Sequence, residues 1–535
     1  MAGYLEFLDD NVLIDKTKCV YCGSCVETCI LDNIRLKVSP CREACPLDLN
    51  CQGYVQLLAR GDIKKAVEVI RETLPFPEVI GRICHHPCED KCKRNEVDGQ
   101  SVALRVIKRF LAEQICLAEV KPVSQKRLER VAVIGGGPAG SMAAYILSQE
   151  GYQVVVYEKS NKLGGMLSQC IPDFRLPQKI VIEEFSQLDR LGVQVKLNTT
   201  VGKDITFDEI VENFNAVIIA VGCQKSKSIE LAGEGAKNVY GAVDFLKAAK
   251  DKTSLEIGKS VIVIGGGNTA IDAAQTAYRL GAKDIRLFCL EARDEMPAFS
   301  WEIKDALEEG IIIENGWGPD QFIVKDEILA GIEFKRCLSV FDKKGNFSPL
   351  YLEGERRLVP ADTVIIAIGQ EVDLDFLKNT GISFGQSYEK IDPFTLQTNI
   401  SKVFACGDLV TGPKTAIEAI AQGRDAAESV KRFLKGLPLK YGRIQTNGFV
   451  QDFEINTAQA EPIPRIQPKK LPGKYRRTFD ELEYGITKEQ AMMEAKRCVS
   501  CGEPFGKYRN CWACLACEVE CPEEAISVKV PFLMR

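Results

Sequence analysis

The strongest constraint on the fold is a Gly-rich turn that occurs twice in this chain of 535 residues. Residues 131–140 read VAVIGGGPAG and residues 261–270 read VIVIGGGNTA, so in both copies an apolar run leads into Gly-x-Gly-x-x-Gly or Ala. The first glycine permits a tight turn, the second lets the backbone approach a pyrophosphate, and the third small residue lets a helix pack on the strand. Because the helix N-terminus also faces the anion, each copy predicts a dinucleotide site. The alternative for a single copy is a turn with a purely structural role.

The runs around these turns predict an α/β fold with parallel sheets. From residue 130 onward, short β-branched runs such as QVVVYE, AVIIAVG, IRLFCLE and TVIIAIG alternate with helical stretches. In each copy the following strand ends in an acid, Glu158 or Glu291, which is placed to bind ribose hydroxyls. We therefore expect two dinucleotide-binding folds, the second inserted into the first, with crossings at residues 216–222 and 363–370.

A third motif assigns the two nucleotides. Residues 398–408 read TNISKVFACGD, and in flavoproteins with two dinucleotide folds the aspartate of this motif bonds the ribityl chain of the flavin. The first fold is therefore predicted to hold FAD, through Gly135, Gly137, Pro138, Ala139, Gly140, Glu158, Lys159, Gly222, Gly407 and Asp408. The second fold is predicted to hold NAD(P), through Gly265, Gly267, Asn268, Thr269, Ala270, Glu291, Arg293 and Gly369.

Cysteine is unusually frequent, with 22 residues against only 2 histidines. The N-terminal sequence MAGYLEFLDDN lacks a secretory pattern, and no apolar run is long enough to span a membrane, so we expect a cytoplasmic protein without a membrane span. Clustered cysteines in such a chain indicate metal or redox chemistry rather than disulfides. A net charge of -5 argues against nucleic acid as a partner. Six scattered cysteines are interpreted as small buried hydrophobic residues: Cys116, Cys170, Cys223, Cys289, Cys337 and Cys406.

Two runs of cysteines, one near each end of the chain, fit the spacing of bacterial ferredoxins. They consist of Cys19, Cys22, Cys25 and Cys29, and of Cys511, Cys514, Cys517 and Cys521. In such a run three thiolates hold one [4Fe-4S] cluster, and the fourth usually points to another cluster. Either the two halves pair with each other, or each takes ligands nearby, from Cys498 and Cys501 or from Cys41 and Cys92. Zinc on paired CxxC units is the rival interpretation.

The patterns divide the chain into six segments. They are a ferredoxin-like module (1–40), a helical [4Fe-4S] domain (41–127), an FAD domain (128–235 and 360–436), an NAD(P) domain (236–359), a linker or arm (437–490), and a second ferredoxin-like module (491–535). In the helical domain, apolar residues recur at helical spacing on both sides of Gly61, with Asp62 as the expected N-cap.

Several motifs in order resemble the family of the glutamate synthase small subunit, of the N-terminal half of dihydropyrimidine dehydrogenase, and of the large subunit of ferredoxin-dependent NADH:NADP transhydrogenases. They are CREACP, PFPEVIGRICHHPCEDKC, VAVIGGGPAG, LGGMLSQCIPDFRLP, VIVIGGGNTAIDAA, EMPA, AIGQ and TLQTN–VFACGD. The resemblance covers about residues 41–435. It implies FAD near Gly165, Met166, Arg175 and Thr415, and clusters among Cys41, Cys45, Cys84, Cys88 and Cys92. Sixteen terminal cysteines allow about three or four clusters, with Cys51 as a spare.

One departure from this family bears on the nucleotide. The family commonly has arginines that grip the 2′-phosphate of NADPH where this chain has Leu290 and Glu291, just before Arg293. A carboxylate ~4 Å from that phosphate repels it by up to a few kcal/mol at intermediate dielectric, enough for about 100-fold discrimination. We therefore expect NADH, with Arg293 available to NADPH if Glu291 turns away. A second departure is Cys170, which stands where the relatives have glycine.

The sequence thus predicts an electron-transfer oxidoreductase in which hydride passes between NAD(P)H and FAD, and single electrons pass to [4Fe-4S] clusters. No catalytic side chain is predicted, because FAD carries the chemistry. By resemblance, we expect the flavin subunit of an anaerobic electron-bifurcating complex. Its expected partners are diaphorase-like and ferredoxin-like flavin or iron–sulfur subunits, and ferredoxin. The alternatives are the small subunit of a glutamate synthase and a binding module that senses redox state.

Overall fold

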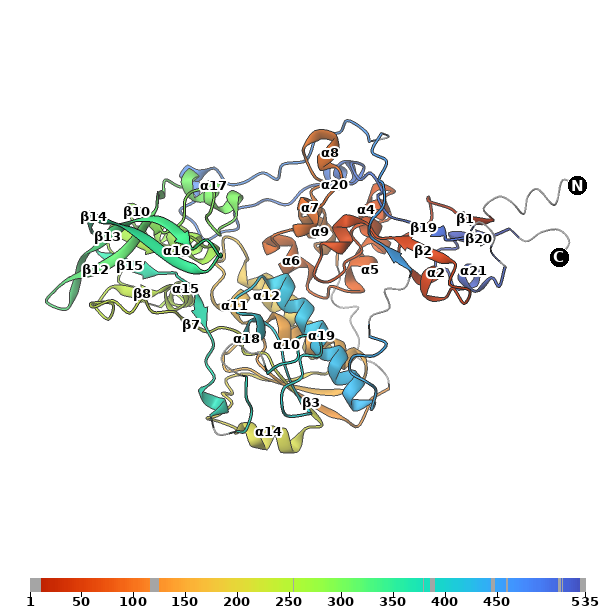
Figure 1. Cartoon of the computed structure of the whole chain (residues 1–535), viewed down its shortest axis with the longest axis horizontal. Helices are drawn as coiled ribbons and strands as arrows, with labels where there is room; N and C mark the ends of the chain where they lie inside the picture. The colour runs from red at the N-terminus through yellow and green to blue at the C-terminus, as the bar shows by residue number, and fades with distance from the viewer. Residues whose placement is uncertain are drawn as a thin grey trace, which may run out of the picture. The chain divides into compact units, whose positions relative to one another are not determined.

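The computed structural model describes residues 11–115, 125–253, 255–378, 380–384, 390–443, 448–458, 460–508, 511 and 513–529 (Figure 1). The chain divides into two compact units. The first comprises Met1–Glu119, Pro438–Lys469 and Gly485–Arg535, and the second comprises Val120–Leu437 and Lys470–Tyr484. The predicted six segments are a finer division and stay a prediction. Cys116 and the first ten residues lie outside the described residues.

The second unit contains a five-stranded parallel sheet in the order β17-β6-β3-β4-β5. Its strands are β3 (Arg130–Ile134), β4 (Gln153–Tyr157), β5 (Gln194–Lys196), β6 (Ala216–Ile219) and β17 (Val403–Ala405). The predicted runs are confirmed as strands, and each of the central strands β3, β4 and β6 is buried over four consecutive residues, as expected for a sheet covered on both faces. Its helices are α10 (Pro138–Gln149), α11 (Met166–Gln169), α12 (Gln178–Phe185), α13 (Gln187–Arg190), α14 (Phe207–Asn213), α18 (Asp408–Thr411) and α19 (Ala416–Leu434), with the 3-10 helix η3 (Asp375–Leu377).

A second parallel sheet, in the order β11-β10-β9-β15-β8, repeats this plan. Its strands are β8 (Val239–Gly241), β9 (Ser260–Ile264), β10 (Asp284–Cys289), β11 (Ile312–Asn315) and β15 (Thr363–Ile366). Its helices are α15 (Ala242–Lys250), α16 (Asn268–Arg279) and α17 (Ser300–Glu308). The strand that leads into the Gly-rich turn, β3 or β9, lies in the middle of each sheet. The insertion of the second fold into the first is therefore confirmed.

Smaller elements complete the second unit. An antiparallel sheet of β12 (Trp317–Lys325), β13 (Ile328–Phe341) and β14 (Phe347–Pro360) packs its buried face against the second parallel sheet through Phe288 and Phe334, whose rings stack at 4.0 Å. The two crossings between the folds pair as β7 (Lys225–Ser226) and β16 (Gln370–Glu371). Residues 470–484, with the 3-10 helix η4 (Gly473–Tyr475), are bound to α17 by ion pairs of Lys470 and Arg476 with Asp305.

The first unit is built from short helices and two small sheets. The helices are α2 (Ser24–Glu27), α3 (Pro40–Glu43), α4 (Cys51–Ala59), α5 (Ile63–Arg71), α6 (Pro77–Ile83), α7 (Pro87–Asp90), α8 (Asn95–Asp98), α9 (Leu104–Ala112), α20 (Lys488–Ala495) and α21 (Ala516–Val519). Helices α4 and α5 meet at Gly61, and the side chain of Asp62 accepts a hydrogen bond from Lys65 N, so the predicted N-cap is confirmed. Within the described residues no helix is long and apolar enough to cross a membrane.

The two ends of the chain fold together in this first unit. Strand β1 (Val12–Ile14) pairs antiparallel with β20 (Ile526–Val528), and β2 (Ile34–Lys37) lies between β18 (Phe449–Val450) and β19 (Glu503–Gly506). Figure 1 shows the red N-terminal strands beside the blue C-terminal ones. The two cysteine runs are thereby brought to one small core.

Candidate functional site

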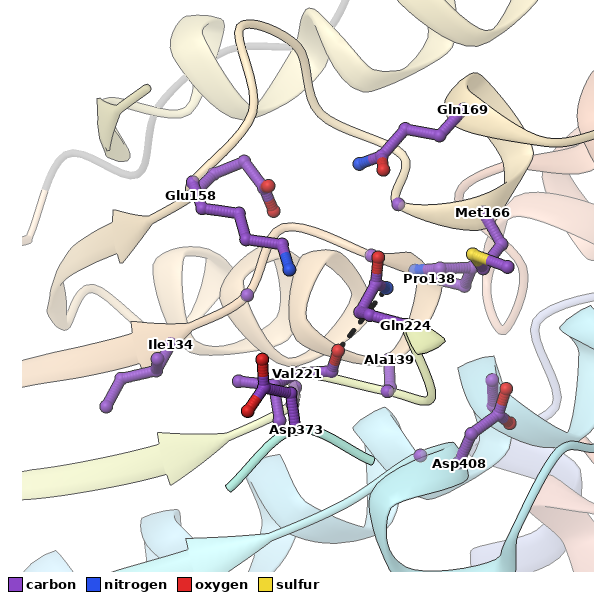
Figure 2. A pocket seen from close by; sticks show the side chains of 18 of the residues that line it. Ile134, Pro138, Ala139, Glu158, Met166, Gln169, Val221, Gln224, Asp373 and Asp408 are labelled. Atoms are coloured by element: carbon purple, nitrogen blue, oxygen red, sulfur yellow. Dashed lines mark hydrogen bonds between the residues drawn. The ribbon is translucent and has the colours of Figure 1, made fainter. Parts of the chain in front are cut away.

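A cavity of about 450 Å³ lies at the carboxyl ends of the first sheet, where α10 begins. Its size is in the range of small-molecule and cofactor sites. It is lined by every residue predicted to hold FAD except Gly140 and Arg175. In Figure 2, Glu158 and Asp408 lie on opposite sides of this cavity, with Pro138 and Ala139 of α10 between them.

The backbone explains the glycines of the turn. Gly135 has a φ of +104°, and a Cβ there would lie 2.4 Å from the carbonyl oxygen of Ala220. Gly140 does not line the cavity because its role is packing: a Cβ there would lie 2.0 Å from the carbonyl oxygen of Gly135. Gly265 repeats the first feature in the second fold, with a φ of +138°. The turn therefore exposes the N-terminus of α10 without a side chain in the way, which suits a pyrophosphate.

Two of the carboxylates that line the cavity accept hydrogen bonds from the backbone. Glu158 is buried, and its Oε2 accepts a hydrogen bond from Gly136 N at 2.7 Å while its Oε1 accepts one from Ser160 N at 2.8 Å. Asp408 accepts a hydrogen bond from Lys414 N at 3.2 Å, and burial raises its pKa to about 6. Both are fixed by the backbone and retain oxygens that can accept hydrogen bonds from ligand hydroxyls.

Arg175 is placed differently from the other predicted FAD residues. Its guanidinium contacts both carboxylate oxygens of Asp272 at 2.7 Å and Glu302 Oε1 at 2.5 Å, so it joins the loop after α11 to helices α16 and α17. Burial raises the pKa of Glu302 to about 7. Arg175 does not line the cavity, and its predicted contact with FAD stays a prediction.

The cavity also contains polar residues that the sequence did not identify. Gln169 is the last residue of α11, and Gln224 and Asp373 belong to the connections between the two folds (Figure 2). Lys203 follows β5. Gln224 donates a hydrogen bond to the carbonyl oxygen of Val221 at 3.4 Å. Gln224, Asp373 and Lys203 lie in connections without a motif, so their spacing carried no signal. Gln169 lies within the LGGMLSQCIPDFRLP segment, where the resemblance implied FAD near Gly165 and Met166 only.

The second fold presents the same arrangement at its Gly-rich turn. Glu291 lies directly against the turn: a Cβ built at Gly266 would lie 2.7 Å from Glu291 Oε2. Asn268 accepts a hydrogen bond from Phe299 N at 2.9 Å, which joins the first turn of α16 to the residue that follows the EMPA segment. Ala270 is buried at the position of Gly140, and Thr269 lies beside it in α16. Arg293 is exposed, and Gly369, with a φ of +129°, follows β15.

The cysteine runs of the two ends combine into two thiol groups. In group 1, Cys521 from the C-terminal run lines a cavity together with Cys19, Cys22 and Cys25. In group 2, the thiols around Cys517 are those of Cys29, Cys511 and Cys514. Each run thus contributes three thiols to its own group and its fourth to the other. Of the two predicted alternatives, the described residues adopt the one in which the halves pair with each other.

The remaining terminal cysteines form two further groups. Group 3 consists of Cys41, Cys92, Cys498 and Cys501, which line another cavity. Group 4 consists of Cys45, Cys84 and Cys88, with Lys108 of α9 beside them. Cys51 lines the cavity of group 3. Its pKa is raised mainly by hydrogen bonds with the thiols of Cys41 in group 3 and Cys88 in group 4.

The surroundings of these thiols fit iron–sulfur clusters. Backbone N–H groups donate to sulfur from Tyr21 to Cys19 at 3.4 Å, from Asn33 to Cys29 at 3.1 Å, from His86 to Cys84 at 3.3 Å and from Ala525 to Cys521 at 3.3 Å. Such hydrogen bonds are a means by which proteins tune cluster potentials.

The scattered cysteines behave as predicted. The five that the structure describes are buried, and burial raises the pKa of Cys170 to about 12. A thiol with such a pKa stays protonated at neutral pH, so it is a poor nucleophile. This environment favours the interpretation of Cys170 as a small packing residue.

Comparison with known families agrees with this division of the chain. Residues 129–423 match the pyridine nucleotide-disulphide oxidoreductase family. Residues 4–120 match the family of dihydropyrimidine dehydrogenase domain II, which is described as carrying a 4Fe-4S cluster. The first match covers both dinucleotide folds, and the second covers the N-terminal cysteine-rich and helical part.

Several curated proteins are similar over most of their length. The beta subunit of an NADP(+)-dependent formate dehydrogenase from Moorella thermoacetica is 33% identical over 86% of this chain and 70% of its own. The beta subunit of an NADPH-Fe(3+) oxidoreductase from Geobacter sulfurreducens is 32% identical, covering 86% and 75%. The small chain of glutamate synthase [NADPH] from Escherichia coli is 31% identical, covering 81% and 93%. Among solved structures, FprA from Mycobacterium tuberculosis in complex with NADPH has the same fold, with a TM-score of 0.52 at 18% identity over 58% of this chain and 85% of its own.

Proposed function

Since the chain belongs to the pyridine nucleotide-disulphide oxidoreductase family, we propose that it is the electron-transfer subunit of a larger enzyme complex. It is an NAD(P)H oxidoreductase that depends on FAD and on iron–sulfur clusters. The observation that carries the proposal is the combination, in one chain, of two dinucleotide folds with four groups of thiols. The similarity to beta and small subunits of multi-subunit oxidoreductases supports it.

The residues around the 450 Å³ cavity are suited to hold FAD. The N-terminus of α10 would bind the pyrophosphate, Glu158 the adenosine ribose and Asp408 the ribityl chain. FAD, when bound, supplies the conversion between a two-electron donor and one-electron carriers. No acid or base from the chain is needed for that step, so the side chains act by binding and orientation.

In the second fold, the N-terminus of α16 and Glu291 are suited to hold the nicotinamide nucleotide. The negative charge of Glu291 beside the turn favours NADH, whose ribose hydroxyl can donate to a carboxylate, over NADPH. The names of the three relatives above specify NADP(H). The charge of Glu291 therefore favours a different nucleotide from the one in those names. The ratio of kcat/KM for NADH and NADPH decides between the two, and a higher value for NADPH would overturn the preference for NADH.

The thiol groups are suited to hold [4Fe-4S] clusters, one in each of groups 1 to 4. The four thiols of each of groups 1, 2 and 3 and the three thiols of group 4 would bind iron as thiolates, with loss of their protons. Because burial and neighbouring thiols raise the pKa values of Cys19, Cys25 and Cys517, we expect these thiols to lose their protons only when the metal is present. The clusters supply one-electron transfer.

At a finer level, we propose that the complex divides the electron pair from one donor between a high-potential and a low-potential acceptor, in the cytoplasm of an anaerobic cell. The proposal rests on resemblance to the flavin subunits of electron-bifurcating complexes. Purification of the native protein under argon should yield diaphorase-like and ferredoxin-like subunits with this chain. NAD(P)H oxidation by that complex should require both acceptors at once. Full activity with either acceptor alone would contradict bifurcation and leave the relay role intact.

A second candidate is the electron-input subunit of a glutamate synthase. The similarity to the small chain of the Escherichia coli enzyme, which covers 93% of that chain, favours it. This function predicts glutamine-dependent formation of glutamate when a large synthase subunit is added to the purified chain. Absence of glutamate formation with a large subunit that is active with its own small chain would exclude it.

A further inference from the structure

The segment of residues 164–176 lies at the junction between the two dinucleotide folds. It begins at the Gly-rich turn of the first fold, where Gly164 N donates to Gly136 O at 2.8 Å. Met166 lines the cavity that is suited to hold FAD, and it also packs against the core of the second fold (Figure 2). Cys170, further along the segment, is a member of that core. One wall of the cavity is therefore built from a segment that packs on the second fold.

A buried lysine of the second fold holds this segment. Lys250 is the last residue of α15, and its side chain is 4% exposed. Its Nζ donates to Leu167 O at 3.3 Å and to Ile171 O at 2.5 Å, and it lies 3.2 Å from Asp173 Oδ1. Lysine is rarely buried unless it is paired, and these three oxygens match the three donors of an ammonium group. Because Leu167 and Ile171 both line the cavity, Lys250 acts on the cavity wall through their backbone.

The C-terminal end of the segment is held by the same fold. Arg175 is paired with Asp272 of α16 and with Glu302 of α17. The guanidinium carbon of Arg279, also in α16, lies 3.7 Å from the centre of the Phe174 ring. Three helices of the second fold thus contact the segment, each through a charged side chain. These contacts oppose a shift of the segment relative to that fold, because such a shift would leave buried charges unpaired.

We propose that Lys250 is a positioning residue for hydride transfer, because by holding residues 167–173 on the second fold it keeps the FAD site in a fixed place relative to the nicotinamide site. This inference rests on the proposed function, in which FAD occupies the cavity and NAD(P)H the second fold. Reaction between two bound molecules needs their reacting atoms within about 3–3.5 Å, and a displacement of about 1 Å can cost about a hundredfold in rate. We therefore expect Lys250 to affect the rate of flavin reduction and not the affinity for either nucleotide.

The test uses the full chain with bound FAD, purified under argon. Lys250→Met removes all three contacts of the ammonium group and keeps an unbranched side chain, whereas Asp173→Asn removes only the ion pair. Lys304→Met is the matched control, because Lys304 is an exposed lysine of α17 in the same unit. Hydrogen–deuterium exchange with mass spectrometry measures how firmly residues 164–176 are held. Stopped-flow absorbance measures the reduction of FAD by whichever of NADH and NADPH reduces the unmodified chain faster.

In Lys250→Met, the amides of residues 164–176 should exchange at least about tenfold faster, as expected when hydrogen bonds to a charged group are lost. The limiting rate of FAD reduction at saturating nucleotide should fall by about tenfold to a hundredfold. The nucleotide concentration that gives half of this rate, and the rate of FAD reduction by dithionite, should stay as in the unmodified chain. Asp173→Asn should change the exchange and the limiting rate in the same direction but less, and Lys304→Met should change neither.

Unchanged exchange or an unchanged limiting rate in Lys250→Met would overturn the proposal. So would a slower reduction that is explained by weaker nucleotide binding, or that is matched by an equal fall with dithionite. If Lys250→Met does not fold or does not retain FAD, the same criteria applied to Asp173→Asn decide. If neither nucleotide reduces the FAD of the unmodified chain, the proposed function itself fails, while the exchange measurement still shows whether Lys250 holds the segment.

Discussion

The pairing of the two ends predicts which cluster each cysteine serves. Cys521 lies 499 positions after Cys22, yet it lines the cavity of group 1 together with Cys22. Its own neighbours in sequence, such as Cys514, belong to group 2. Substitution of Cys521 by alanine should therefore remove the cluster of the N-terminal run and leave that of the C-terminal run in place.

The expected magnitude follows from the number of thiol groups. With one cluster in each of four groups, Cys521→Ala should lower the iron and the sulfide content by about four atoms of each per chain, about a quarter of the total. The effect should not add to that of Cys22→Ala, because both remove ligands from the same cluster. It should add to the effect of Cys514→Ala, and that double variant should lose about eight atoms of each.

Iron and sulfide analysis of the anaerobically purified variants, together with electron paramagnetic resonance (EPR) spectra after reduction, measures both effects. Thermal unfolding of each variant checks that the strands β1 and β20 still pair. The reasoning is refuted if the losses of Cys521→Ala and Cys22→Ala add, while those of Cys521→Ala and Cys514→Ala do not. That result would assign Cys521 to the cluster of its own run.

Three further substitutions concern the second unit. Asp408→Ala should weaken FAD binding by about tenfold to a hundredfold, as expected for the loss of a hydrogen bond to a charged group. The fluorescence of released flavin measures the affinity, and an unchanged affinity would show that Asp408 does not bind FAD. Glu291→Gln should raise the kcat/KM ratio of NADPH to NADH by about tenfold to a hundredfold, and no change would separate Glu291 from nucleotide choice. Burial raises the pKa of Glu302 from 4.5 to about 7, so between these pH values the folded state retains a proton that the unfolded chain loses. The free energy of unfolding therefore falls as pH rises through this interval, by at most about 3 kcal/mol. Melting temperatures from about pH 5.5 to 7.5 should lose this slope in Glu302→Gln, and an identical slope in the variant would contradict the assignment.

The sequence predicts the dinucleotide folds well because their signals are local. The turn at Gly135, the acid at Glu158 and the aspartate at Asp408 each follow a buried strand, and parallel strands bring their carboxyl ends to one edge. Residues such as Gln224 and Asp373 could not be found in this way. They reach the cavity from connections, where no period or motif marks a side chain that faces a ligand.

The thiol groups show a different limit. The spacing of Cys19, Cys22 and Cys25 predicts three ligands of one cluster, but no local pattern says that Cys521 completes the group. That contact depends on the pairing of β1 with β20 across nearly the whole chain. The burial of Lys108 was missed for another reason: it lies in an ordinary amphipathic helix, and only the three-dimensional structure shows that this lysine is 4% exposed.

The most direct test of the central claim is an anaerobic titration of the purified chain with NADH, and in parallel with NADPH, followed by absorbance and by EPR. The account predicts that the flavin absorbance bleaches and that signals of reduced [4Fe-4S] clusters then appear in the same sample. Bleaching without any cluster signal at potentials where dithionite produces one would show that the thiol groups do not receive electrons from the flavin. Failure of both nucleotides to bleach a bound flavin would contradict the role of the second fold.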